Sequence, residues 1–285
     1  MKTNNTMKTI DTKDWVLFSE RRNSTSFVSK DGSFMLKASP KDKSFSLQEL
    51  QDEMDISNAA LSLGIKTPEP VEIVRLSDGS FGAVYKYIQN KKSLTRAISE
   101  EPDRLDEIMK IYADATKTLH STMDEKHMLP SFENRLEEAL LCSSQYSKDE
   151  QKFILEAAYK RSGKECCLQG DFQPSNIILS DNSCWFIDLG FLSYGDSLFD
   201  IGFLWYVVKS SNARVYDRIF HTDKAGAEHI WQSFARHYFE TDDLDAVEKK
   251  IAPYGCISIN LMLKTLPNTS FIGDNKDYIF EMIGK

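Results

Sequence analysis

The first 88 residues of the chain alternate short apolar runs with polar turns, a pattern that predicts β-strands. The Asp31-Gly32 pair between two such runs is a strong hairpin signal. Residues 46–63 differ, because their apolar residues recur at helical spacing. Gly64 ends this helix, and two prolines soon after it favour extended chain. The predicted strands are 14–18, 27–30, 33–38, 71–76 and 82–88.

From about residue 89 the pattern changes to long amphipathic helices. Residues 166–188 are the exception, since they read as strands around a polar loop at 171–176. The predicted helical segments are 102–123, 131–161 with a break near Ser143-Ser144, and 197–285 with breaks near 210–212, 222–224 and 253–255.

These patterns predict an α+β protein of two lobes, joined by a hinge near residues 85–90. Residues 1–88 would form a small N-terminal lobe, an antiparallel sheet with one helix that binds nucleotide. Residues 89–285 would form a larger, mostly helical C-terminal lobe with the catalytic and substrate-binding residues.

The composition is that of an ordinary globular protein, with 41% hydrophobic and 27% charged residues. The first six residues are polar and lack the apolar core of a signal peptide. The most apolar stretch, residues 199–208, is too short to span a bilayer. The five cysteines form no C-x-x-C pair, which disfavours zinc and a disulfide framework. A cytoplasmic protein is therefore expected.

The net charge of −8 is unevenly distributed. Residues 1–88 hold equal numbers of acidic and basic residues, whereas residues 89–285 hold 31 acidic and 23 basic residues. A negative C-terminal portion disfavours nucleic acid and anionic membrane as partners. It favours a cationic small-molecule substrate, and it leaves the oligomeric state open.

The strongest chemical signal is a loop that carries Asp171 and, five positions later, Asn176, between apolar strands. A carboxylate there can accept the proton of an attacking hydroxyl, and an amide oxygen can help to hold Mg²⁺ on nucleotide phosphates. Asp188 then ends an apolar strand before Gly190. A carboxylate in that place suits Mg²⁺, which takes few carboxylates and several other oxygen ligands.

Three ordered motifs resemble those of aminoglycoside phosphotransferases and choline kinase-like small-molecule kinases. They are Gly170-Asp171 with Asn176, Ile187-Asp188 with Gly190, and Gly195-Asp196 with Asp200-Ile201. The resemblance extends over roughly residues 15–210. It implies the protein-kinase-like fold, ATP and Mg²⁺ as cofactors, Asp171 as catalytic base, and Asn176 and Asp188 as metal ligands.

The same resemblance implies further roles. Lys37 would bind the α- and β-phosphates, and Glu53 would pair with Lys37, with Glu49 as the alternative partner. Backbone groups of Lys86 and Ile88 would contact the adenine. His120 would have a structural role, and Asp200 would brace the catalytic loop.

The sequence departs from the family pattern in two places. Gln169 stands where the family usually has His, although Gln can also donate and accept hydrogen bonds. No glycine-rich loop follows the first strand, and Asn23-Ser24-Thr25-Ser26 stands there instead. Backbone N–H groups of Ser24, Thr25 and Ser26 could still bind phosphate, as small residues do in anion-binding turns.

The sequence therefore predicts transfer of the γ-phosphoryl group of ATP to a hydroxyl of a small polar molecule. Aminoglycosides, choline-like alcohols, sugars and amino-acid alcohols all remain open as acceptors. A catalytically silent nucleotide-binding module is the alternative, because of Gln169 and the missing glycine loop. A protein kinase is disfavoured, since no Ala-Pro-Glu segment or long activation loop follows Asp188.

Overall fold

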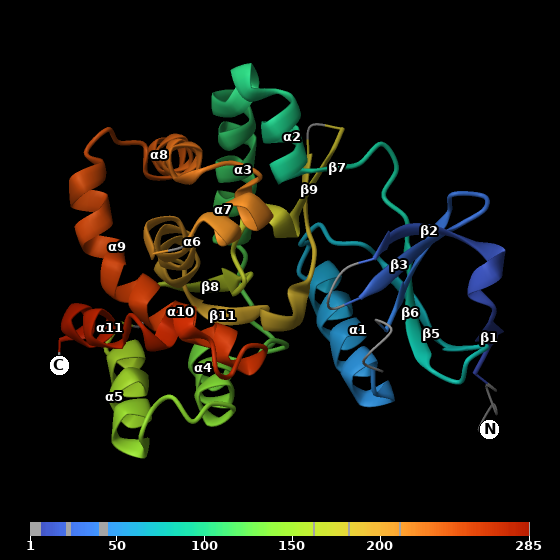
Figure 1. Ribbon diagram of the computed structural model, residues 1–285, viewed down its shortest axis with the longest axis horizontal. Coiled ribbons are helices and arrows are strands. Elements are labelled where there is room, and N and C mark those ends of the chain that lie inside the picture. Colours follow the sequence, from blue (N-terminus) through green and yellow to red (C-terminus); the bar gives the residue numbers. More distant parts are fainter. Residues whose placement is uncertain are drawn as a thin grey trace. The chain divides into compact units, whose positions relative to one another are not determined.

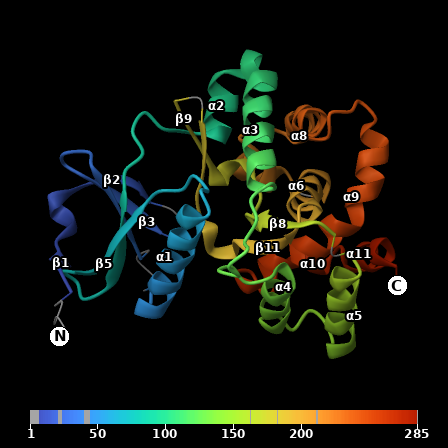
Figure 2. The same ribbon diagram turned by 180° about the vertical axis from the view of Figure 1, so that it is seen from behind.

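The computed structural model describes residues 7–20, 24–39, 45–161, 163–181, 183–210 and 212–284. The chain divides into two compact units, Met1–Lys91 and Lys92–Lys285. Figures 1 and 2 show their elements from opposite sides.

The first unit is built on a six-stranded sheet with the strand order β1-β5-β6-β4-β3-β2. All neighbouring strands are antiparallel except β1 and β5, which run parallel, so the sheet is mixed. The sequence pattern misses β1, because two residues are too few to show periodicity. The strands are β1 (Thr9–Ile10), β2 (Trp15–Glu20), β3 (Thr25–Ser29), β4 (Phe34–Ala38), β5 (Pro70–Leu76) and β6 (Phe81–Lys86).

The hairpin predicted at Asp31-Gly32 is confirmed. Gly32 has a φ of +72°, which glycine adopts at little cost, and the Asp31 carboxylate accepts the Ser33 N–H at 3.0 Å. The turn joins β3 to β4, and β4 lies inside the sheet between β3 and β6. This places Lys37 on a central strand.

One helix, α1 (Leu47–Ser62), covers part of one face of this sheet (Figure 1). Ser46 and Glu49 form a capping box at its start, so two backbone N–H groups at the helix end are satisfied. Leu50 and Met54 of the helix pack against Ala83 and Tyr85 of β6. This contact fixes the rotation of α1 and therefore which of its acidic residues face the sheet.

The second unit is mostly helical, and α6 lies at its centre in both views (Figures 1 and 2). Its helices are α2 (Leu94–Glu100), α3 (Leu105–Leu119), α4 (Phe132–Leu141), α5 (Lys148–Tyr159), α6 (Leu198–Ser210), α7 (Ala213–Phe220), α8 (Lys224–Phe239), α9 (Leu244–Ser258), α10 (Ser270–Gly273) and α11 (Lys276–Ile283). Short 3₁₀ helices lie at η1 (Thr12–Asp14) in the first unit and at η2 (Pro102–Arg104), η3 (Pro174–Asn176), η4 (Leu189–Phe191) and η5 (Ile259–Lys264) in the second.

The breaks predicted near residues 143–144, 210–212 and 222–224 are confirmed, although Ser211 lies outside the described residues. The break predicted at 253–255 is wrong, because Pro253 and Gly255 lie inside α9. Tight packing explains the continuous helix: a Cβ on Gly255 would lie 2.4 Å from the Gly202 carbonyl oxygen of α6. The glycine therefore serves the contact between two helices rather than a turn.

Two small sheets complete the second unit, with orders β10-β9-β7 and β11-β8. They hold the segment with the chemical motifs between the helices. Their strands are β7 (Lys92–Ser93), β8 (Glu165–Leu168), β9 (Ile177–Ser180), β10 (Ser183–Phe186) and β11 (Ser193–Asp196). Among the residues that the structure describes, no helix is long and apolar enough to cross a membrane.

Candidate active site

Asp171 lies on the loop between β8 and η3, and two amide side chains of the same loop hold its carboxylate. Gln173 Nε2 donates to Asp171 Oδ1 at 2.8 Å, and Asn176 Nδ2 donates to Asp171 Oδ2 at 2.7 Å. Asn176 Nδ2 also donates to the Asp171 carbonyl at 2.9 Å. The loop therefore orients its own carboxylate, with one donor on each oxygen.

The backbone before Asp171 is fixed by Asp200 in the first turn of α6. The N–H groups of Gln169 and Gly170 donate to its two carboxylate oxygens, each at 2.8 Å. Gly170 has a φ of +81°, and a Cβ there would lie 2.4 Å from the Phe191 carbonyl oxygen. Only glycine fits this close approach, so the geometry of the loop explains the glycine of the motif.

The residue after Asp171 is anchored in the core. The Phe172 ring is fully buried and stacks on Tyr112 of α3, with centroids 5.2 Å apart. It also contacts Phe234 of α8, at 5.9 Å. Asp171 is thus held from both sides, by hydrogen bonds before it and by aromatic packing after it.

Burial raises the pKa of Asp171 to about 6. The hydrogen bonds from Asn176 and Gln173 oppose this shift, the negative charge of Asp188 adds to it, and the positive charge of Arg218 opposes it. A carboxylate with a pKa near 6 is a stronger base than an ordinary Asp and is still ionised at neutral pH.

The two residues predicted to hold metal come together at the end of the β9–β10 hairpin. The Ile187 N–H donates to the Asn176 carbonyl at 3.0 Å, which extends the pairing of Phe186 with Ile177 by one step. Asp188 follows with a φ of +54° and an exposed side chain. Its backbone lies in the left-handed region, which a residue other than glycine adopts at a cost in free energy and often at a functional site.

The donor set suits Mg²⁺ shared with a phosphate ligand. Asn176 directs its amide nitrogen at Asp171, so its amide oxygen points to the other side, and Asp188 supplies a carboxylate. Among the described residues, no group of three or more His, Cys, Asp or Glu side chains could form a metal site from protein alone. Mg²⁺ commonly takes one or two protein ligands and completes its shell with phosphates and water.

In the first unit, Lys37 and Glu53 form a direct ion pair. Lys37 Nζ lies 2.7 Å from Glu53 Oε1 and 2.8 Å from Oε2, and the Tyr85 hydroxyl also donates to Oε1 at 2.9 Å. Glu49, the alternative partner, instead accepts the Ser46 N–H in the capping box at 2.8 Å. The side chains of Lys37 and Glu53 are 18% and 25% exposed, so the pair is partly buried.

Lys86 and Ile88 lie at the end of β6 and just beyond it. The Lys86 N–H donates to the Glu69 carbonyl at 2.9 Å, so a contact from Lys86 to a base would come from its carbonyl. Its side chain pairs with Glu69 at 2.7 Å and is more than half exposed. Ile88 is buried.

The predicted phosphate loop at residues 23–26 needs a correction. Thr25 and Ser26 lie in β3, where they pair with Ala38 and Lys37 of β4 on one side and with β2 on the other. Their backbone groups belong to the sheet, because β3 is an inner strand. Ser24 precedes the strand, and Asn23 lies outside the described residues.

Each unit also has, beside its candidate residues, side chains that the sequence did not single out. Gln173 could have been noticed as an amide two positions after Asp171, and Tyr85 as a polar group on the strand predicted at 82–88. Tyr238 of α8, whose hydroxyl lies 2.7 Å from His120 Nδ1, gave no signal, because it lies 67 positions after Asp171 in the sequence.

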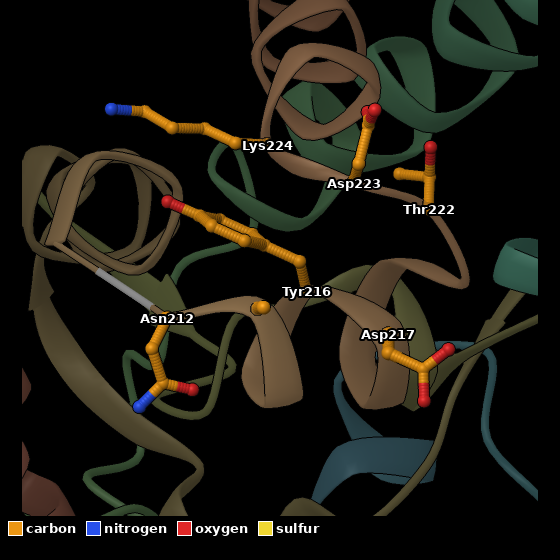
Figure 3. A pocket seen from close by; sticks show the side chains of 7 residues that line it. Asn212, Tyr216, Asp217, Thr222, Asp223 and Lys224 are labelled. Carbon is orange, nitrogen blue, oxygen red and sulfur yellow. The ribbon is translucent and has the colours of Figure 1, made fainter.

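A surface hollow of about 590 Å³ lies at the starts of α7 and α8 (Figure 3). Its walls include Asn212, Tyr216, Asp217 and Asp223. Both Asn212 and Asp223 cap a helix, and the Tyr216 hydroxyl donates to the Val208 carbonyl at 2.8 Å. No residue predicted for the active site lines this hollow.

The comparison with protein families identifies the chain. The model of the phosphotransferase enzyme family matches residues 15–234, and the chain belongs to that family. A search of the curated proteins found no significant match.

Solved structures share the fold at low sequence identity. A choline/ethanolamine kinase family protein from Mesorhizobium loti superposes with a TM-score of 0.59 at 14% identity, over 95% of this chain and 88% of that one. The GDP complex of an aminoglycoside 2′-phosphotransferase gives 0.55 at 15%, over 98% and 94%. An amicoumacin kinase in complex with AMP-PNP, Ca²⁺ and Ami gives 0.54 at 15%, over 97% and 89%. The predicted α+β, protein-kinase-like fold is thereby confirmed.

Proposed function

We propose that this member of the phosphotransferase family transfers the γ-phosphoryl group of ATP to a hydroxyl of a small molecule. The observation that carries the proposal is the loop at Asp171. It holds a carboxylate with a pKa of about 6 in a fixed orientation, beside an amide oxygen and an exposed carboxylate that suit Mg²⁺. The neighbouring folds with ATP analogue or GDP bound support a nucleotide substrate.

Each residue has one role in the proposal. Asp171 orients the acceptor hydroxyl and takes its proton as the new bond to phosphorus forms. Asn176 and Asp188 would hold Mg²⁺, which supplies positive charge next to the phosphate oxygens when bound. Asp200 keeps the loop in place through the N–H groups of Gln169 and Gly170.

The first unit is proposed to bind the nucleotide. Lys37 would bind the α- and β-phosphates while Glu53 and Tyr85 orient it, and the ends of β6 near Lys86 and Ile88 would contact the base. Ser24, Thr25 and Ser26 remain candidates for phosphate contacts, with Thr25 and Ser26 offering hydroxyls rather than backbone N–H groups. The excess of acidic residues after residue 88 favours a cationic acceptor, and a cytoplasmic location would give access to ATP.

Two features bear on the alternatives. From Asp188 to α6 the chain has only η4 and β11, which supports a small-molecule kinase over a protein kinase with a long activation loop. The fixed geometry of Asp171 and Asn176 supports a working enzyme over a silent nucleotide-binding module.

The test is ADP release from Mg²⁺-ATP with a panel of aminoglycosides, choline-like alcohols, sugars and amino-acid alcohols, followed by Asp171→Asn with the best acceptor. The variant should fold and bind Mg²⁺-ATP, while its rate falls by about 10²–10⁴ because the general base is lost. Asp149→Asn, a change of an exposed residue in α5, is the matched control. An unchanged rate in Asp171→Asn would refute the mechanism, and nucleotide binding without any transfer by the wild type would favour the silent module.

A further inference from the structure

A row of polar side chains, buried at His120 and Asp200 and partly exposed at Tyr238, links α8 to the loop that carries Asp171. The Tyr238 hydroxyl lies 2.7 Å from His120 Nδ1, and His120 Nε2 lies 3.2 Å from Asp200 Oδ2. The side chains of His120 and Asp200 are only 4% and 1% exposed. Asp200 in turn accepts the two backbone N–H groups that precede Asp171.

The partners determine where the hydrogens lie. Asp200 accepts two backbone N–H groups as a carboxylate, so His120 Nε2 must carry a hydrogen to bond with it. Burial raises the pKa of Tyr238 well above its usual value, so its hydroxyl keeps its proton and can donate to His120 Nδ1. The imidazole is thereby held at both nitrogens, and the ring cannot turn away from Asp200 without losing a bond at each end.

The same two helices fix the other side of Asp171. His120 caps the C-terminus of α3, and Tyr238 stacks on Phe234 within α8, with ring centroids 5.8 Å apart. Phe172 packs against Phe234 and against Tyr112 of α3. A shift between α3 and α8 would therefore disturb the backbone before Asp171 and the side chain after it together.

We infer that Tyr238 and His120 are positioning residues for the Asp171 base, which act through Asp200. This role requires no contact with the nucleotide or the acceptor. His120 supplies Asp200 with its third hydrogen-bond donor, and Tyr238 keeps His120 turned towards Asp200. The inference rests on the proposed function in that Asp171 must be the base for the positioning to affect turnover.

Tyr238→Phe is the decisive variant, because it removes the hydroxyl and keeps the ring that stacks on Phe234. Hydrogen–deuterium exchange of the Gln169 and Gly170 amides, monitored by NMR, reports directly on how well Asp200 holds the loop. Both amides should exchange about tenfold faster, as the loss of one hydrogen bond of about 1.4 kcal/mol allows. Basal ADP release from Mg²⁺-ATP should slow by a similar factor, with the KM for ATP unchanged, because the loss affects the transition state and not binding.

Two further variants separate positioning from packing. Tyr146→Phe is the control, since Tyr146 is buried and its hydroxyl has no partner among the described residues. It should change neither the two amides nor the rate. His120→Gln keeps a side-chain N–H near Asp200 and should retain more activity than His120→Leu.

Exchange of the Gln169 and Gly170 amides that stays at the wild-type rate in Tyr238→Phe would overturn the inference, whatever the activity. The inference also fails if exchange rises equally throughout α3, α6 and α8, because that is general destabilisation. If the two amides alone exchange faster but turnover is unchanged, the row holds the loop without serving catalysis, which also contradicts the inference. Absence of phosphoryl transfer in the wild type would count against the proposed function. The exchange rates of the Gln169 and Gly170 amides would then decide the present inference.

Discussion

The two compact units hold their charged candidate residues in different ways. In the first unit, Lys37 meets Glu53 directly, in a partly exposed ion pair between a strand and a helix. In the second unit, the backbone just before Asp171 is held by the buried Asp200, which accepts the N–H groups of Gln169 and Gly170. Only side chains meet in the first arrangement, whereas the second adds buried main-chain hydrogen bonds to the side-chain donors Gln173 and Asn176.

The difference indicates how each region responds to a ligand. The Lys37 ammonium has three hydrogens, so it can bind a phosphate oxygen while it keeps a bond to Glu53. Breaking a buried hydrogen bond leaves a partner unsatisfied and costs about 1–3 kcal/mol. The first region can adjust to a nucleotide, whereas the second keeps the base in one place.

The largest effect is expected at Asp188 in the second unit. Asp188→Ala should lower Mg²⁺-dependent ADP release by about 10³ or more, because a metal ion that neutralises phosphate charge is worth several kcal/mol and each 1.4 kcal/mol is tenfold. The measurement is a Mg²⁺ titration of ADP release at saturating ATP.

Asp181→Ala is the matched control for this prediction. Asp181 is also exposed, precedes β10 and has a φ of +49°, close to the +54° of Asp188. Alanine costs similar backbone strain in both places, so any difference comes from the carboxylate. Equal rates in the two variants would remove Asp188 from the metal site.

A smaller effect is expected at Lys37 in the first unit. Lys37→Met should raise the KM for ATP and lower kcat, with kcat/KM reduced about 10–100-fold, since hydrogen bonds to charged groups contribute about 1.5–3 kcal/mol. Lys8→Met removes another ion pair of the same sheet, Lys8 with Glu72 at 3.3 Å, and should leave the kinetics unchanged. If the two variants behave alike in steady-state kinetics, Lys37 does not bind the nucleotide.

The pKa of Asp171 predicts a pH dependence of rate and stability. Only the ionised carboxylate can take a proton, so kcat/KM should be half-maximal near pH 6 and fall about tenfold per pH unit below it. The folded-state pKa lies above that of the unfolded chain, so the ionised form destabilises the fold as pH rises from about 4 to 6.

It follows that Asp171→Asn, though much slower as an enzyme, should unfold at a higher temperature than the wild type at pH 8. The difference should shrink as the pH is lowered towards 5. Thermal unfolding of both proteins over this range checks the sign, and a wild type that is the more stable of the two at pH 8 would show that burial does not raise this pKa.

The sequence predicted the Lys37–Glu53 pair of the first unit well, and the supports of Asp171 in the second unit only in part. Lys37 and Glu53 lie on a strand and a helix that are close in sequence, and the helical spacing of α1 selects which acid faces the sheet. The capping box then explains why Glu49 is not the partner. Short-range patterns suffice for such a pair.

The supports of Asp171 are contacts between segments that lie far apart in the sequence, and the periodicity of apolar residues does not encode such contacts. Tyr238 and Phe172 both pack on Phe234 of α8, and the aromatic character of these residues fits any buried position. The same limit explains why Pro253 and Gly255 suggested a break, since only the contact with Gly202 shows why they stay helical. The parallel strand β1 was missed because its two residues are defined by their partner.

The smallest effect is expected at Gln169, whose difference from the family's usual His left an inactive protein as an alternative. Its backbone N–H donates to Asp200 at 2.8 Å, whereas its side chain makes only a long contact of 3.4 Å from Nε2 to the Ile187 carbonyl. Its Oε1 is buried and has no partner among the described residues. Any residue except proline retains the backbone bond, so Gln169→His should keep kcat within about threefold, the equivalent of less than 1 kcal/mol. Gln169→Leu should also be mild, because it gives up a weak bond and removes an unsatisfied oxygen together. A tenfold or larger loss of kcat in Gln169→Leu, with Gln169→His active, would show that the Gln169 side chain, and not only its backbone N–H, holds the loop.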